Sequence, residues 1–154
     1  MRKQFLLILI TALGSFYSFA QNNKPVYDSA LAKKLGADDY GMKQYVMAFL
    51  KAGPNKNIDS AGRTQLIQKH LKNIGRLAKE GKLVVAGPFL DKGDLAGIFI
   101  FNVTTIEEAR ALTATDPAVK AGLFEIELHP WYGSAALMQV TNVHPTLQKK
   151  SITD

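Results

Sequence analysis

The chain has 154 residues, a formal net charge of +6 and no cysteine. This length suits one globular domain with a single hydrophobic core, and the lack of cysteine excludes disulfides, thiol nucleophiles and thiolate metal sites. Lysine and arginine are scattered among acidic residues. Nucleic-acid binding would call for a basic stripe with interleaved aromatic residues, so we expect no nucleic-acid partner.

The first twenty residues have the three parts of a secretory signal peptide. Arg2 and Lys3 are followed by an apolar run over 5–13, and residues 18–20, Ser-Phe-Ala, form a small-x-small cleavage site. The alternative is a membrane anchor, but the run is about half of the roughly 20 apolar residues that a span requires. We therefore predict a signal peptide over 1–20, export to the periplasm or the medium, and no membrane span after cleavage.

Two further segments flank the predicted domain. An N-terminal arm over 21–44 carries one helical signal, with Asp28 as a candidate N-cap and Gly36 as a candidate stop, and we expect it to lie on the domain. A C-terminal extension over 133–154 contains an apolar segment, 135–140, that we expect to form one more short strand before a polar end.

Residues 45–132 predict one domain in which strands and helices alternate. The strands are short runs of strand-forming residues, and the helices have apolar residues at steps of three and four after capping residues. In chain order we expect a strand over Tyr45–Leu50, a helix from Asp59 or Ser60 to Gly81, a hairpin of strands over Leu83–Phe89 and Leu95–Val103, a helix from Thr105 to Thr115, a helical turn from Asp116 to Gly122, and a strand over Phe124–Trp131.

This βαββαβ order predicts an α+β protein with a ferredoxin-like antiparallel sheet and both helices on one face. The other face then needs cover. Residue alternation places His129 and Trp131 on the same side of the last strand, and a tryptophan on an open sheet face indicates a pocket or a partner. Two such sheets packed face to face would form a dimeric α+β barrel, so we expect a homodimer.

His70 is the first candidate for chemistry. It lies three residues after Ile67 and four before Ile74, on the helix stripe that faces the sheet. Burial of an imidazole favours its neutral form and a neighbouring carboxylate favours its charged form, so such a group can exchange protons near neutral pH. The alternative is a core histidine that is satisfied by one hydrogen bond.

Asp116 is the natural partner for His70, because it lies in a loop that enters the last strand and could reach the first long helix. A carboxylate on one ring nitrogen would fix the tautomer and raise the basicity of the other nitrogen. The alternative is an ordinary helix N-cap, since Pro117 follows directly.

Several short motifs resemble the YCII-related (YciI-like) family over roughly 44–131. Each motif is weak alone, but their order and spacing together are specific. They are the run from His70 to Leu77, Gly81-Lys82-Leu83, Ala86-Gly87-Pro88-Phe89, Glu107-Glu108-Ala109, Asp116-Pro117, Ala121-Gly122 and Pro130-Trp131.

The resemblance implies a ferredoxin-like fold that dimerises into a barrel, an active site in which His70 faces Asp116, and no cofactor. Family members with an assigned activity include a dehydrochlorinase-type lyase that acts on a chlorinated, hydroxylated aromatic ring. Most members look like plain cytoplasmic domains, so the signal peptide, the arm and the extension are departures, and the substrate does not carry over.

The remaining candidates define a pocket and exclude a metal. Gly87, Pro88 and Phe89 end a strand, and we expect them to line a small-molecule pocket together with Trp131. The histidines of the chain show no metal-ligand spacing, so we expect no metal site.

Two hypotheses for the function follow. The first is an exported, cofactor-independent acid–base enzyme of the lyase or isomerase type, which uses His70 and Asp116 on a small cyclic or aromatic molecule. The second is a non-catalytic module of the cell envelope that binds a small ligand or assists assembly. A monooxygenase on a similar barrel is a weaker third, because no residue set dedicated to haem or flavin is visible.

Overall fold

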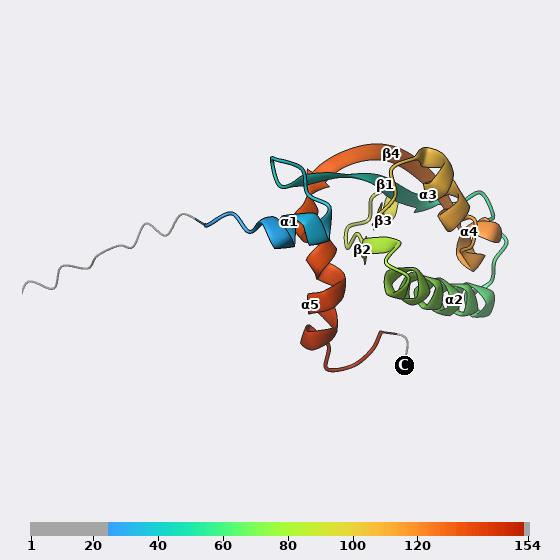
Figure 1. Ribbon diagram of the computed structural model, residues 1–154. Coiled ribbons are helices and arrows are strands. Elements are labelled where there is room, and N and C mark those ends of the chain that lie inside the picture. The colour runs from blue at the N-terminus through green and yellow to red at the C-terminus, as the bar shows by residue number, and fades with distance from the viewer. Residues whose placement is uncertain (1–24, 153–154) are drawn as a thin grey trace, which may run out of the picture.

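The computed structural model describes residues 25–152. The predicted signal peptide, 1–20, lies outside this range and stays a prediction. Within the described range no helix is long and apolar enough to cross a membrane. Figure 1 shows a curved sheet with α2, α3 and α4 at one end of the molecule and α1 and α5 at the other.

The centre of the molecule is a four-stranded antiparallel sheet with the strand order β2-β3-β1-β4. This confirms the predicted α+β class, and the strand order is that of a ferredoxin-like βαββαβ unit. The elements are α1 (Ser29–Leu35), β1 (Met42–Ala52), α2 (Ser60–Lys79), β2 (Leu83–Pro88), β3 (Leu95–Phe101), α3 (Ile106–Thr113), α4 (Pro117–Lys120), β4 (Phe124–Ser134), the 3₁₀ helix η1 (Ala135–Gln139) and α5 (Val140–Leu147).

The helix in the arm forms as predicted. The Asp28 side chain accepts a hydrogen bond from the Leu31 N–H, and Gly36 ends α1 in the left-handed conformation with φ 71°. α1 contacts η1, so this helix lies on the C-terminal part of the chain. β1 begins at Met42, which lies within the segment predicted as arm.

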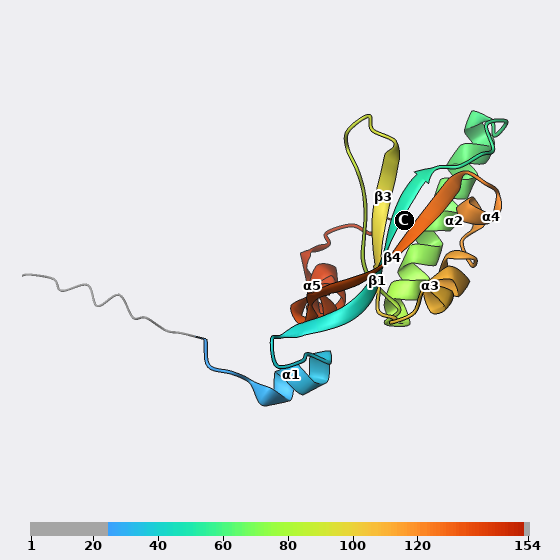
Figure 2. The ribbon, with the colours of Figure 1, turned by 90° about the horizontal axis from the view of Figure 1, so that it is seen from above.

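The main hydrophobic core lies between the sheet and the helices α2, α3 and α4. The helix side of the sheet presents its apolar side chains to all three helices, as the view in Figure 2 also indicates. The buried members of this core are Val46, Ala48, Leu50, Leu77, Leu83, Phe99, Phe101, Val103, Ala109, Ala118, Leu123 and Phe124.

A smaller cluster covers part of the opposite sheet face. Tyr45, Val84 and Ile100 are buried there, and Leu137 and Met138 of η1 pack against them. The remainder of this face, with the register partners Phe49 and Ile98, is only half buried. This open area is the face that the sequence predicts to need cover.

The predicted strand over 135–140 is wrong, because this segment is η1 and the start of α5. β4 pairs with β1 as far as Met42 opposite Ser134, so a longer strand would have no partner there. The Ser134 hydroxyl instead accepts a hydrogen bond from the Ala136 N–H and caps the turn. The turn places Leu137 against the cluster of Tyr45, Val84 and Ile100 on the sheet. The burial of Leu137 there favours a helix over a strand in this segment.

Two glycines permit a close crossing that positions α4. Gly53 and Asn55, after β1, donate backbone hydrogen bonds to the carbonyl oxygens of Leu123 and Gly122. A Cβ atom at Gly53 would lie 2.2 Å from the Gly122 carbonyl oxygen, and Gly122 itself has a φ of 70°. This crossing ties the loop after β1 to the segment that follows α4.

Candidate active site

His70 lies between α2 and the sheet, as its helix stripe predicts. The Asp59 side chain accepts a hydrogen bond from the Gly62 N–H at 2.7 Å and caps the N-terminus of α2. The position of this cap fixes where the helix begins, and therefore which of its residues face the sheet. The His70 residue is 7% exposed. Its ring centroid lies 5.7 Å from that of Phe99 on β3 and 5.1 Å from that of Phe124 on β4. The imidazole is therefore held in apolar surroundings.

Asp116 contacts this imidazole and also caps its own helical turn. Asp116 Oδ2 lies 2.7 Å from His70 Nδ1, while Oδ1 accepts the Ala118 N–H at 2.8 Å and starts α4. The residue is 1% exposed. The two roles that the sequence left as alternatives are thus taken by the two oxygens of one carboxylate.

The surroundings of Asp116 keep it ionised. Burial raises the pKa of the carboxyl, but the hydrogen bond and charge of His70 lower that pKa, helped by the Ala118 N–H and the Asn73 amide, so it lies below its usual value of 3.8. An ionised carboxylate only accepts hydrogen bonds. His70 Nδ1 must therefore carry the proton in the contact.

The second ring nitrogen, Nε2 of His70, is left available for chemistry. Among the described residues it has no hydrogen-bond partner, and no fully buried side-chain nitrogen or oxygen there lacks one. Nε2 therefore meets solvent at the edge of the core. In the neutral tautomer that Asp116 enforces, this nitrogen carries a lone pair and can accept a proton.

Asn73 and Arg76 form a chain of hydrogen bonds that ends on Asp116, and sequence reasoning did not predict it. The buried Asn73 amide donates to Asp116 Oδ2 at 3.4 Å, and its Oδ1 accepts from Arg76 Nη2 at 2.8 Å. Arg76 also donates to Thr115 Oγ1 at 2.9 Å and to Glu80. The spacing of three residues from His70 to Asn73 and on to Arg76 is the one sequence signal for this line of residues.

Comparison with known proteins identifies the domain. Residues 43–131, more than half of the chain, match the YCII-related domain family. The chain belongs to this family. The resemblance inferred from the short motifs is thereby confirmed.

Among solved structures, the chain is similar to the 5-chloro-2-hydroxyhydroquinone dehydrochlorinase of Burkholderia phenoliruptrix, in its complex with 2,5-dihydroxybenzoquinone. The two chains are 23% identical with a TM-score of 0.43, and the similarity covers 56% of this chain and 92% of the dehydrochlorinase. No curated protein matches the chain in sequence.

The four residues predicted to line one pocket lie at two places in the YCII-related domain. Gly87 and Pro88 pair with Ile98 and Gly97, at the end of the sheet where β4 begins beside His70. Phe89 directly follows that strand and is partly exposed. Trp131 lies instead near the far end of β4 and on the open sheet face, where its ring centroid is 5.9 Å from that of Tyr45. Their shared pocket stays a prediction.

Two hollows in the described part of the chain are not lined by His70. A small one of about 180 Å³ is lined by Trp131, Tyr45 and neighbouring residues. A larger one lies between α2, β2 and α5. Neither is lined by His70 or Asp116, so the His–Asp contact sits at the edge of the core rather than in either hollow.

The other histidine near a carboxylate is exposed. His129 Nε2 lies 2.7 Å from Glu127 Oε1, and its ring contacts Phe49 edge-on. Hydrogen bonds from Lys51 and then from His129 hold the pKa of Glu127 below its usual value. Within residues 25–152 no three histidine, cysteine or acidic side chains gather closely enough to hold a metal ion.

Proposed function

We propose that the protein is a cofactor-independent acid–base enzyme in which Nε2 of His70 takes and returns a proton. The observation that carries this proposal is the 2.7 Å contact between His70 Nδ1 and the ionised Asp116, made within an aromatic shell. General acid–base catalysis of this kind contributes on the order of 10²–10⁴ in rate. Membership of the YCII-related family is in accord with this assignment.

The reaction would be an elimination or an isomerisation on a small cyclic or aromatic molecule. In an elimination, Nε2 takes a proton from carbon, the C–H electron pair forms the new double bond, and the leaving group departs as an anion. In an isomerisation, the imidazolium returns the proton to another atom of the same molecule. Asp116 stabilises the imidazolium in both cases.

Hydrogen–deuterium exchange tests the proton transfer without requiring the natural substrate. Chlorinated hydroquinones and cyclic hydroxyketones are incubated with the protein in D₂O, and carbon-bound deuterium is followed by NMR. We expect His70→Ala to abolish the exchange. His129→Ala is the matched control, because His129 also contacts a carboxylate but is exposed. Unchanged exchange in a folded His70→Ala protein, or equal loss in both variants, would overturn the proposal.

The second candidate is a non-catalytic module that binds a small ligand, and the position of the two hollows away from His70 favours it. Under this hypothesis His70 has a structural role only. His70→Phe should then destabilise the fold, because it removes the partner of the buried Asp116 carboxylate, but it should leave ligand binding intact. The exchange assay separates the two candidates: a protein that binds a small ligand without exchanging its carbon-bound protons favours the second.

We also propose that two chains pack through the open sheet face into a dimeric α+β barrel. The half-buried apolar side chains Phe49 and Ile98 on that face support this. Sedimentation velocity should give a dimer that Ile98→Arg converts to a monomer, whereas Leu90→Arg in the exposed β2–β3 loop should not. A monomeric wild-type protein would contradict the barrel.

The segment 1–20 is proposed to be a signal peptide, so the substrate would be met in the periplasm or the medium. N-terminal sequencing of protein recovered from an expressing bacterium tests this. We expect a chain that begins at Gln21. Recovery of an intact chain in the cytoplasm would rule export out.

A further inference from the structure

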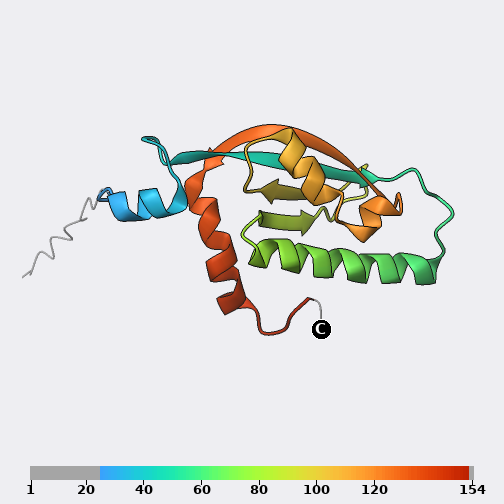
Figure 3. The same ribbon diagram turned by 45° about the vertical axis from the view of Figure 1, so that its right-hand side comes forward.

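The C-terminal extension forms a cleft with the domain that lies apart from His70. α5 stands beside the edge strand β2 and across from the C-terminal half of α2 (Figure 3). The cleft between these elements has a volume of about 820 Å³, and Ser151 and Ile152 are also among its lining residues. Sites for small molecules have volumes of about 300–1,000 Å³, so this cleft has the size of a ligand site.

The floor of the cleft is apolar. α2 contributes Ile74 and Ala78, and β2 contributes Val85. On the facing wall α5 has no buried residue, and Val140 and Ile152 remain 37% and 72% exposed. A ligand with an apolar body would therefore bury apolar surface that the chain itself leaves exposed to water.

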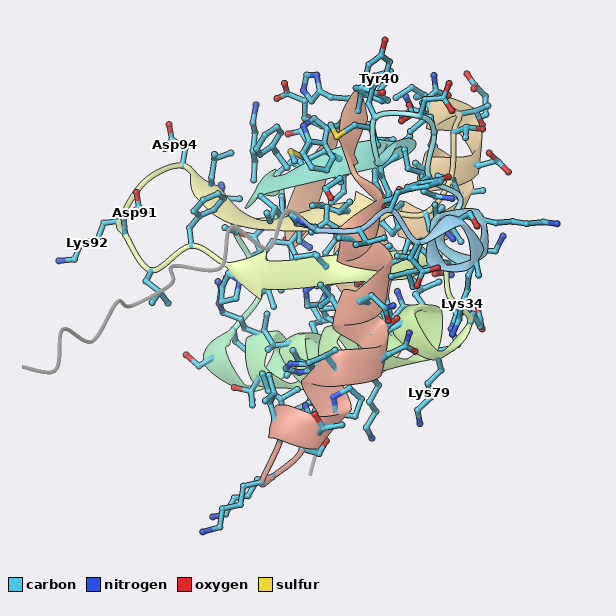
Figure 4. The ribbon with its side chains drawn as sticks, turned by 60° about the vertical axis from the view of Figure 1, so that its left-hand side comes forward. Lys34, Tyr40, Lys79, Asp91, Lys92 and Asp94 are labelled. Carbon is cyan, nitrogen blue, oxygen red and sulfur yellow. The ribbon has the colours of Figure 1, made fainter. Side chains whose placement is uncertain are left out.

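The rim of the cleft is positively charged. Lys72, Arg76 and Lys79 line it from α2, and Lys79 is labelled at the end of that helix in Figure 4. Glu80 is the one acidic residue among the described lining residues, and it already accepts two hydrogen bonds from Arg76. Among the described ion pairs none includes Lys72 or Lys79. The local field therefore favours an anion.

We propose that this cleft binds a small amphipathic carboxylate, whose apolar body lies on the floor between β2 and α5 and whose head pairs with Lys72 and Lys79. The family match ends at residue 131, so the wall that α5 provides lies outside the domain common to the family. The proposal does not depend on the chemistry of His70. Neither His70 nor Asp116 lines the cleft.

Decanoate and decanol form a matched pair of probes, because they share the chain length and differ in charge. Binding to the purified protein is measured by calorimetry below the micelle concentration of decanoate and is mapped by amide NMR shifts. We expect decanoate to bind at least tenfold more tightly than decanol. The largest shifts should fall on β2, α5 and the second half of α2.

Two pairs of variants locate the site. Gly75 lines the cleft and an added Cβ would meet nothing within 4 Å, so Gly75→Met should place a long side chain over the apolar floor and weaken binding at least tenfold, while Gly75→Ala should retain it. Lys72→Gln with Lys79→Gln should weaken decanoate at least tenfold. The control, Lys33→Gln with Lys34→Gln, makes the same charge change on α1 and should have no effect.

Four results with these probes and variants would overturn the proposal, and a fifth concerns the oligomeric state. The four are equal affinity for decanol and decanoate, unchanged affinity in Gly75→Met, shifts confined to the open sheet face around Trp131, and no binding of decanoate at millimolar concentration. The cleft could instead hold a second copy of the chain, bound at the edge strand β2. Gly75→Met would then dissociate the oligomer, whereas decanoate would not. This result would also overturn the proposal, because the occupant would be a protein chain and not a small carboxylate.

Discussion

The two oxygens of the Asp116 carboxylate accept two different hydrogen bonds, one from the Ala118 N–H and one from His70 Nδ1. In Asp116→Asn the carbonyl oxygen can still accept the Ala118 N–H, but the NH₂ group that faces His70 is a donor. His70 Nδ1 would then have to accept, so the ring proton would move to Nε2 and this nitrogen could no longer take a proton. We expect a folded protein whose free energy of unfolding falls by about 1.5–3 kcal/mol, the range for a hydrogen bond to a charged group, and whose exchange activity falls on the order of 10²–10⁴. Denaturant unfolding and the exchange assay measure the two effects.

Asp59→Asn is the control for this variant. Asp59 also caps a helix through one side-chain oxygen, and asparagine caps about as well as aspartate. This control should keep both stability and activity. Equal behaviour of the two variants would mean that the contact between Asp116 and His70 has no special role.

Asn73 acts on the site through Asp116. Asn73→Leu fills a similar volume but removes the amide that donates to Asp116 and accepts from Arg76. We expect the pKa of Asp116 to rise because one donor to its carboxylate is gone. The protein should also lose about 1–3 kcal/mol, because Asn73 Oδ1 accepts from Arg76 and, at 3.2 Å, from Thr115 Oγ1, and both donors lose that acceptor. A carbon-13 titration of the Asp116 carboxyl measures the shift. An unchanged titration would leave Asn73 with a packing role only.

At the scale of elements, the loop after β1 crosses the loop before β4. This crossing fixes the position of Asp116, at the start of α4, relative to His70 on α2. Gly53→Ala would place a Cβ atom 2.2 Å from the Gly122 carbonyl oxygen, and that oxygen belongs to the backbone and cannot rotate away. We expect a loss of about 1–3 kcal/mol and a disturbed His70 signal. Thermal unfolding and NMR check this.

Gly75→Ala in α2 is the comparison for this variant. The added methyl group meets no atom within 4 Å, and alanine in a helix interior is more stable than glycine by about 0.5–1 kcal/mol. Destabilisation by both substitutions would show that the crossing is not the cause.

The exposed β2–β3 loop contrasts with this crossing. Asp91, Lys92 and Asp94 point away from the body of the molecule there (Figure 4), and all three are exposed. Substitutions in this loop should leave both stability and the His70 contact unchanged, within about 0.5 kcal/mol.

For the whole molecule, the His70–Asp116 contact predicts a pH dependence of stability. The pKa of Asp116 is lower in the folded chain than its usual value of 3.8. Its contribution to stability is therefore present above about pH 4 and is lost as the pH falls through the lowered pKa. The difference in unfolding free energy between wild type and Asp116→Asn should shrink between pH 5 and strongly acid solution, as measured by urea unfolding at each pH. A difference that stays constant would contradict the assigned ionisation.

Sequence alone determined the features that depend on neighbours along the chain. The cap at Asp28, a cap at Asp59 or Ser60, the placement of His70 on the buried stripe of α2, and the βαββαβ order of elements along the chain all follow from spacing and capping residues. Helix and strand periodicity decide which side chains share a face. The family could also be identified from the sequence, because its motifs are short and local.

Only the tertiary structure decided the contacts between distant segments. The second oxygen of Asp116 meets His70, and Asn73 joins them, because α4 is held beside α2 by a crossing of loops that no local pattern encodes. The extension turns into η1 and α5 because Ser134 lies opposite Met42, the first residue of β1, so β1 offers no pairing partner beyond this point. An apolar run does not reveal whether a partner strand will be there, and the backbone hydrogen bonds of a strand require one.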